Sequence, residues 1–224
     1  MTKPTATVDR WYQDACGAAH ALELLGERWA LLVVRELMFG PRRFGELRGA
    51  LPGISANILT QRLLGLEASG IVVRRPLPGS SKSQMYELTL WGYESEPIFQ
   101  VLGRWAARSP SHDPSLPLSA ASLLLSFRTM IHAKRVKDAE ATIGLRLDDD
   151  DFVAHVRDGG ITIRRGDVRG TDVTVVGRAV ALASVVYGGR PLADAEADGA
   201  LRIEGDRGLA RRFVTWFVLP PKIA

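Results

Sequence analysis

Apolar positions follow a helical period along the first hundred residues of the chain. They recur every three or four residues in Ala15 to Leu25, in Trp29 to Phe39 and in a shorter stretch from Phe44 to Leu51. Each stretch ends at a turn that contains glycine or proline, such as Pro52-Gly53. The pattern therefore predicts three helices joined by tight turns.

A fourth helix is predicted from Ser55, which is a good N-cap, to about Ser69, where Gly70 follows. This helix is amphipathic, because leucines recur on one face and short polar side chains occupy the other. The leucine face, expected in the core, carries Leu59, Leu63 and Leu66, and the polar face carries Asn57, Thr60 and Gln61.

A β-hairpin and a further helix are predicted next. Ile71 to Arg75 and Gln84 to Leu88 have strand-like patterns, and the connection between them is polar and basic. Thr89 can cap a helix over Leu90 to Ala107. The large apolar residues of that helix are Trp91, Ile98, Val101, Leu102 and Trp105.

The second half has a different pattern, with short strand-like runs between helices. Residues 109–117 are rich in Ser, Pro, His and Asp and are predicted to link a first domain (1–108) to a second (118–224). Helices are expected over 118–132, 177–187 and 209–217, and strands over 142–147, 152–157, 161–165, 173–176 and 200–203. Asp158-Gly159-Gly160 is typical of a hairpin turn. The expected fold class is α+β.

The composition is that of a soluble globular protein, with 46% hydrophobic and 24% charged residues. No apolar run approaches the roughly 20 residues of a membrane-spanning helix, and the polar first ten residues lack the apolar core of a secretory signal. We therefore expect a cytoplasmic protein without a membrane partner. The single cysteine, Cys16, excludes an internal disulfide and a cysteine-rich zinc site.

No catalytic or cofactor-binding pattern stands out. The four histidines are scattered, no glycine-rich phosphate loop is present, and no combination of Ser, His and acid can be assembled. The acidic run from Asp148 to Asp151 lacks the spaced ligands of a calcium loop, so we expect a solvated turn in which Asp149 and Asp150 face water. The prediction is a protein that is not an enzyme and needs no metal or cofactor.

Positive charge is concentrated in the segment of the predicted fourth helix and hairpin. The net charge of the chain is +4, and between Arg42 and Lys82 seven basic residues stand against two acidic ones. Such an excess favours a polyanionic partner. The order of three helices, a tight turn, a helix and a hairpin is that of a winged helix-turn-helix, in which one helix enters the major groove of double-stranded DNA.

The fourth helix carries the residues expected to read DNA. Asn57 and Gln61 offer paired donors and acceptors to base edges, and Thr60 can touch a base or a phosphate. Ser55 lies at the helix N-terminus, where backbone amides favour phosphate. The expected phosphate anchors are Arg42, Arg43, Arg74, Arg75 and Lys82.

Five motifs lie along the first domain: Cys16-Gly17-Ala18-Ala19-His20-Ala21-Leu22, Gly26-Glu27-Arg28-Trp29, Gly40-Pro41-Arg42-Arg43-Phe44-Gly45-Glu46-Leu47, Pro52-Gly53-Ile54-Ser55 and Leu59-Thr60-Gln61-Arg62-Leu63. With these motifs the domain resembles the HxlR-type winged-helix regulators over roughly residues 15–107. The resemblance implies a bacterial, homodimeric regulator of transcription whose terminal helices form much of the dimer contact. Two half-sites of a short inverted repeat would then lie one helical turn apart.

At two positions of the fourth helix the expected DNA contact has an alternative. Arg62 turns towards the core side, where an ion pair with Glu67 or with an acid on another helix is an equal alternative to a DNA contact. Many HxlR-type proteins have a basic and a polar residue where this chain has Leu64 and Gly65. Either only the first two turns of the helix enter the groove, which we favour, or Leu64 packs against the hairpin.

Cys16 has two interpretations. Some HxlR-type proteins sense oxidants or electrophiles through a cysteine near this position, and a helix N-terminus favours the thiolate. The alternative, which we favour, is a small buried residue without a redox role.

Three segments stand out in the second domain: Thr171-Asp172-Val173-Thr174-Val175-Val176-Gly177, Tyr187-Gly188-Gly189-Arg190-Pro191-Leu192 and Ala200-Leu201-Arg202-Ile203-Glu204-Gly205-Asp206. With these segments the domain resembles the sterol-carrier-type lipid-binding fold over roughly residues 118–219. The resemblance implies a five-stranded sheet with helices on one face, enclosing an apolar tunnel for an apolar effector. A closed domain that serves only dimer contacts is the alternative. The candidate tunnel residues, which any core would contain, are Leu124, Phe127, Phe152, Val185, Phe213 and Phe217.

Three classes of function remain open. The expected one is a homodimeric, sequence-specific DNA-binding regulator of transcription, controlled by an apolar small molecule. A lipid or apolar-molecule carrier whose winged helix serves protein interaction is the alternative, although it would not need the polar face of the fourth helix. A module that binds only proteins is the third, and the salt dependence of binding separates it from a DNA binder.

Overall fold

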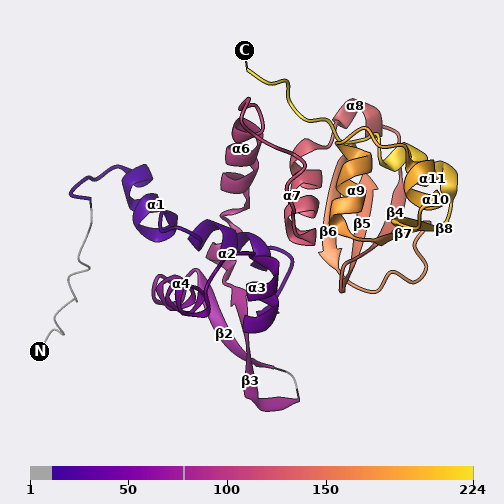
Figure 1. The fold of residues 1–224 in the computed structure, drawn as a ribbon. Coiled ribbons are helices and arrows are strands. Elements are labelled where there is room, and N and C mark those ends of the chain that lie inside the picture. Colours follow the sequence, from indigo (N-terminus) through magenta and orange to yellow (C-terminus); the bar gives the residue numbers. More distant parts are fainter. Residues whose placement is uncertain (1–11, 78, 224) are drawn as a thin grey trace, which may run out of the picture. The chain divides into compact units, whose positions relative to one another are not determined.

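The computed structural model describes residues 12–77 and 79–223 of the 224-residue chain. These described residues divide into two compact units, one within 12–34 and 41–92 and the other within 35–40 and 93–223. Both units combine helices with a β-sheet (Figure 1), which confirms the α+β class.

The first unit has the predicted order of helices followed by a hairpin. The helices are α1 (Gly17–Leu25), α2 (Ala30–Leu37, whose last residues belong to the second unit), α3 (Phe44–Ala50), α4 (Ala56–Ala68) and α5 (Leu90–Tyr93). The strands β1 (Arg42–Arg43), β2 (Val72–Leu77) and β3 (Ser80–Leu88) form an antiparallel sheet of order β1-β3-β2. The strand β1 was not predicted.

The amphipathic pattern of α4 decides how this helix lies. Leu59, Leu63 and Leu66 are each at most 2% exposed and form part of the core. The side chain of Ser55 accepts a hydrogen bond from the amide of Ile58 and caps the helix, as predicted. Gly70, at φ +72°, takes the left-handed conformation that turns the chain into β2.

The single helix predicted over Leu90 to Ala107 is wrong. The structure has two helices there, α5 and α6 (Glu96–Ala106). Pro97 lies in the first turn of α6, where its missing N–H is harmless, whereas a continuous helix would lose a hydrogen bond and clash at that position. Thr89 does cap the first of them, because its Oγ1 accepts the amide of Gly92 at 3.0 Å.

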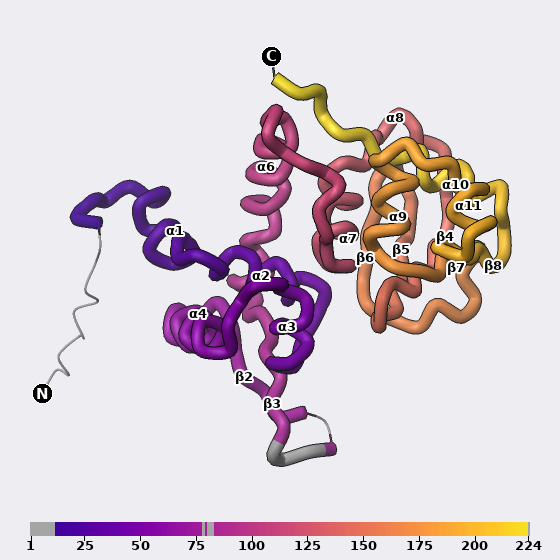
Figure 2. Tube along the Cα trace, in the orientation of Figure 1, coloured from indigo at the N-terminus to yellow at the C-terminus, as the bar shows by residue number. Residues whose placement is uncertain are grey.

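The second unit is built on a five-stranded sheet, as the resemblance implied. The sheet has the order β6-β5-β4-β7-β8, in which β4 and β7 are parallel and the other neighbours antiparallel. Figure 2 traces the chain through β4, β5 and β6 before it reaches β7. The strands are β4 (Ala141–Leu147), β5 (Asp150–Arg157), β6 (Gly160–Arg165), β7 (Val173–Gly177) and β8 (Leu201–Gly205). The helices are α6, α7 (Ala120–Met130), α8 (Ala133–Val136), α9 (Ala179–Val186), α10 (Leu192–Ala197) and α11 (Arg207–Phe213), of which α8 and α10 were not predicted.

One face of this sheet forms the core, where Ile143, Leu145 and Phe152 are fully buried. Helix α7 contacts β6, and α11 contacts β7 and β8. On the opposite face the loop before β7 lies close to β4, because a Cβ at Gly144 would lie 2.8 Å from Thr171 Oγ1 of that loop. No helix of the described residues has both the length and the apolar character that crossing a membrane requires.

The acidic run between β4 and β5 is only partly a solvated turn. Asp148 and Asp149 are exposed between the two strands, as expected. The expectation for Asp150 is wrong, because Asp150 forms an ion pair with Arg165. Pairing of neighbouring strands places carboxylates beside arginines, so the Asp150 carboxylate contacts an arginine and not only water.

Candidate nucleic-acid interface

The polar face of α4 is exposed and carries Asn57, Thr60 and Gln61. Among the described residues, neither the side chain of Asn57 nor that of Gln61 has a hydrogen-bond partner, so both side-chain amides are available for paired bonds to a base. Thr60 Oγ1 donates to the carbonyl of Ala56 at 2.9 Å. The hydroxyl hydrogen of Thr60 is therefore used inside the helix, and its methyl group is the part that can meet a thymine methyl.

The start of α4 offers donors to a phosphate. Ser55 accepts the amide of Ile58 at 3.2 Å, which leaves its own hydroxyl hydrogen to donate. The first amides of a helix have no partner within the helix. Ser55 thus lies where an anion would be favoured.

Arg62 is held by an acid from another part of the first unit. Its Nη1 lies 3.0 Å from Oε2 of Glu27, and the Arg62 side chain is only 20% exposed. Glu67, the other acid considered, pairs instead with Arg74 at 3.2 Å. The structure thus shows the ion pair, while a DNA contact of Arg62 stays a prediction.

The basic residues of the hairpin also have acidic neighbours. Arg74 lies over the ring of Tyr86 at 5.4 Å and pairs with Glu67, and Arg75 pairs with Glu87 at 2.5 Å. An arginine has five N–H donors, so one ion pair leaves others for a phosphate. The backbone of Lys82 lies in β3, but its side chain is outside the described part of the chain.

The other predicted anchors lie around the start of α3. Arg43 is the N-cap residue of α3, its backbone amide donates to Glu46 at 2.9 Å, and its side chain is 57% exposed. Arg42 is half-buried in β1. Leu64 of α4 is 50% exposed, so it adds an apolar patch beside the polar face.

An apolar stripe follows one face of α6. Ile98, Val101, Leu102 and Trp105 are spaced three or four residues apart, and Trp105 is 72% exposed. The opposite face of α6 contacts α7. Large exposed apolar patches mark interaction sites in soluble proteins.

Cys16 is exposed, so the favoured interpretation of a buried residue is wrong. It is the N-cap residue of α1, and the nearby backbone amides of Ala18 and Ala19 favour the thiolate and so hold the pKa of its thiol below the ordinary value. His20 does not approach this thiol as a partner but bonds Glu23 at 3.0 Å.

The six candidate tunnel residues of the second domain are all buried. Phe127 stacks on Phe217 with ring centroids 4.1 Å apart and meets Phe213 edge to face at 5.7 Å. A ligand could enter among these rings only by separating them. The pocket stays a prediction.

An open cavity of about 760 Å³ lies elsewhere in the second unit and is lined partly by Thr142, His155 and Thr162 on three adjacent strands. The sequence carried no signal for it, since strand alternation predicts which face is buried and not where space remains. In the described ranges, no cluster of three or more His, Cys, Asp or Glu side chains could hold a metal ion.

Comparisons with known proteins divide the chain in two. Residues 24–113 match the family described as HxlR-like helix-turn-helix, and residues 113–222 match the one described as alkyl sulfatase C-terminal. The uncharacterized HTH-type transcriptional regulator sll1512 of Synechocystis is 43% identical over 83 residues, which are 37% of this chain and 62% of that protein. The HTH-type transcriptional regulator YodB of Bacillus subtilis is 41% identical over 86 residues, which are 38% of this chain and 77% of YodB. The solved structure of reduced YodB, 36% identical, covers 45% of this chain and all of that chain, with a TM-score of 0.40.

The winged helix and these matches define a helix-turn-helix regulator of transcription, and the curated relatives are regulators and not enzymes. The chain belongs to the HxlR-like helix-turn-helix family. The similarity to curated relatives is limited to about two fifths of the chain. The alkyl sulfatase C-terminal match of the second domain was not predicted.

Proposed function

We propose that this regulator reads a short inverted repeat of double-stranded DNA as a homodimer, with α4 in the major groove. Asn57 and Gln61 would read base edges, and Thr60 would contact a thymine methyl. The observation that carries the proposal is the pair of exposed amides without a partner among the described residues, on a helix whose other face is fixed in the core. Backbone phosphates would be held by Ser55 and by the basic set Arg42, Arg43, Arg74, Arg75 and Lys82.

Selection from a random pool of duplexes tests this reading. The full-length protein should enrich an inverted repeat with half-site centres about 10 bp apart. A footprint should then cover both half-sites. An enriched pool without a common motif would contradict sequence-specific reading.

We propose that the apolar stripe on α6 is a dimer interface, which contacts a second copy of the chain. Ile98, Val101, Leu102 and Trp105 would pack against the same residues of the other protomer, since a twofold contact uses one patch twice. The HxlR-like match ends at residue 113 and so includes α6. Light scattering after size exclusion should give twice the chain mass of 24.5 kDa. A monomer at micromolar concentration would refute the dimer.

We further propose that the second domain is of the sterol-carrier type and binds an apolar effector. Its five-stranded sheet and its aromatic cluster support this assignment. A ligand would replace ring contacts such as that between Phe127 and Phe217. Titration with a fluorescent fatty-acid analogue should show saturable uptake, and an absence of saturation would count against the pocket.

Cys16 is proposed as a secondary, redox-sensitive position. Its exposure and the lowered pKa of its thiol support reaction with oxidants. Hypochlorite or diamide should then release DNA from the protein, and Cys16→Ser should resist that release. Equal release from both proteins would remove the redox role.

A further inference from the structure

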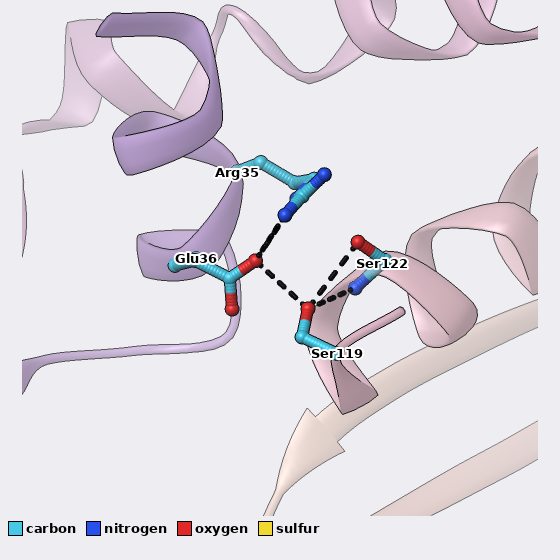
Figure 3. A network of polar contacts seen from close by, with 4 residues as sticks. All are labelled: Arg35, Glu36, Ser119 and Ser122. Carbon is cyan, nitrogen blue, oxygen red and sulfur yellow. Dashed lines mark hydrogen bonds and ion pairs between the residues drawn. The ribbon is translucent and has the colours of Figure 1, made fainter. Parts of the chain in front are cut away.

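The last turn of α2 is anchored in the second unit, although the helix begins in the first. Glu36 is 1% exposed, and its Oε1 accepts hydrogen bonds from Ser119 Oγ at 2.8 Å and from Arg35 Nη2 at 2.7 Å (Figure 3). Ser119 is the N-cap residue of α7, and its Oγ also accepts the amide of Ser122. One hydroxyl group thus joins the end of α2 to the start of α7.

Phe39, just after α2, adds a second set of contacts in the same unit. Its ring meets Phe152 of β5 edge to face at 5.9 Å, and the Arg128 guanidinium of α7 lies over it at 4.5 Å. Its carbonyl accepts from Arg165 Nε at 3.4 Å. Phe152 is one of the six candidate ligand-pocket residues, so a ligand there would disturb a direct neighbour of Phe39.

The opposite end of α2 is connected to the proposed recognition helix. The amide of Ala30, the first residue of α2, donates to the carbonyl of Glu27 at 2.9 Å. The carboxylate of Glu27 pairs with Arg62 of α4 at 3.0 Å, next to Gln61. An α-helix of eight residues is a stiff rod about 12 Å long, so a shift at one end is passed to the other.

The Glu36 carboxylate is incompletely satisfied, which is unusual for a buried charge. Its Oε2 is buried and has no hydrogen-bond partner among the described residues. A buried carboxylate that lacks part of its hydrogen bonds contributes little to the free energy of unfolding, so stability alone does not explain its presence. A contact that breaks and forms again during a change of state would explain it.

We propose that the bond between Glu36 and Ser119 couples the state of the second domain to α4 through α2. The coupling rests on the proposed function, in which α4 reads DNA. Because coupling is reciprocal, DNA bound at α4 must also change the stability of the second domain. That change can be measured without knowing an effector.

Hydrogen exchange of the full-length protein, read by mass spectrometry with and without an enriched duplex, tests the coupling. In the unaltered protein, DNA should slow exchange about fivefold or more in peptides of α7 and β5, which is the lower end of typical couplings between sites. Ser119→Gly keeps an acceptable N-cap but removes the hydroxyl, and Glu36→Ala removes the carboxylate. Both variants should lose the slowing in α7 and β5 while the Kd for the duplex changes by less than about threefold.

Ser126→Ala is the matched control. It removes another hydroxyl from α7, one that bonds Leu123 and Tyr187 and not α2, and it should keep the slowing. Slowing confined to the first unit of the unaltered protein would overturn the coupling but leave the proposed function standing. Undiminished slowing in both variants would also overturn it. A protein that binds no enriched duplex would refute the proposed function itself, and the coupling with it.

Discussion

Asn57→Ala should weaken binding to a specific DNA site and leave general DNA affinity and folding unchanged. The Asn57 side chain bonds no other described residue, so its removal leaves no partner unsatisfied. Alanine is the better helix former by up to about 0.7 kcal/mol, and the free energy of unfolding should therefore hold or rise slightly. A paired amide contact to a base contributes about 1 to 3 kcal/mol, so each half-site should lose a factor of about 5 to 150 in affinity, and the dimer on the enriched duplex should lose at least that much.

Fluorescence anisotropy on the enriched duplex and on a scrambled duplex of equal length measures this difference. Gln13→Ala, which removes a similar amide from an exposed position outside the helices, is the control and should change neither Kd. Circular dichroism melting verifies that Asn57→Ala folds normally. Equal losses on the two duplexes, or a Tm lowered by more than a few degrees, would refute the assignment of Asn57 to base reading.

Four further predictions concern other parts of the chain. Lys82→Ala should weaken all DNA sequences alike and reduce the slope of log K against log salt by about 2, because each protomer of the dimer loses one phosphate contact, as measured by anisotropy at several salt concentrations. Val101→Glu should convert the dimer to a monomer in light scattering, because two carboxylates would meet in an apolar contact; an unchanged mass would contradict the α6 interface. Gly144→Ala should destabilise the protein by about 1 to 3 kcal/mol in urea unfolding, since its Cβ has no space, whereas Gly49→Ala, with nothing within 4 Å, should not. The rate at which iodoacetamide alkylates Cys16 should rise with pH, with a midpoint pH below that of an ordinary thiol, because two amides lower the pKa of the thiol and favour the thiolate. The same midpoint pH in folded and urea-unfolded protein would contradict this.

Elements with strong local signals were predictable from the sequence. Helix α4 has a capping serine, a terminal glycine and leucines at regular spacing, and each of these signals lies within the helix or next to it. The hairpin turn at Asp158 and Gly159 was predictable too, since both residues adopt the positive φ that this dipeptide favours. Such features depend on neighbours in the sequence.

Features that depend on distant residues could not be predicted. Strand β1 is two residues long and exists because Arg42 and Arg43 pair with Tyr86 and Met85 of β3. The partner of Arg62 is Glu27, which lies far away in the sequence, in the turn between α1 and α2. Pro97 is a local signal for the start of α6, but apolar residues keep the helical period before and after it, so the period alone predicts one continuous helix.

For the candidate site, the sequence predicts which side chains are exposed but not which hydrogen bonds and contacts they make. The exposed polar face of α4 follows from helical periodicity, whereas the hydrogen bond that uses the Thr60 hydroxyl depends on the side-chain rotamer. The exposure of Cys16 could not be read from its apolar neighbours in α1. The tight ring contacts of Phe127 likewise depend on packing that periodicity does not describe.

The salt dependence of affinity for the enriched duplex tests the central claim most directly. If α4 reads bases while the basic set holds phosphates, log K should fall linearly with log salt, with a slope near −0.9 for each phosphate neutralised, about −9 for the ten anchors of a dimer. The enriched duplex should also remain bound at salt concentrations that release a scrambled one. An affinity that is indifferent to salt, or equal for both duplexes, would contradict a DNA-reading winged helix and favour a module that binds proteins.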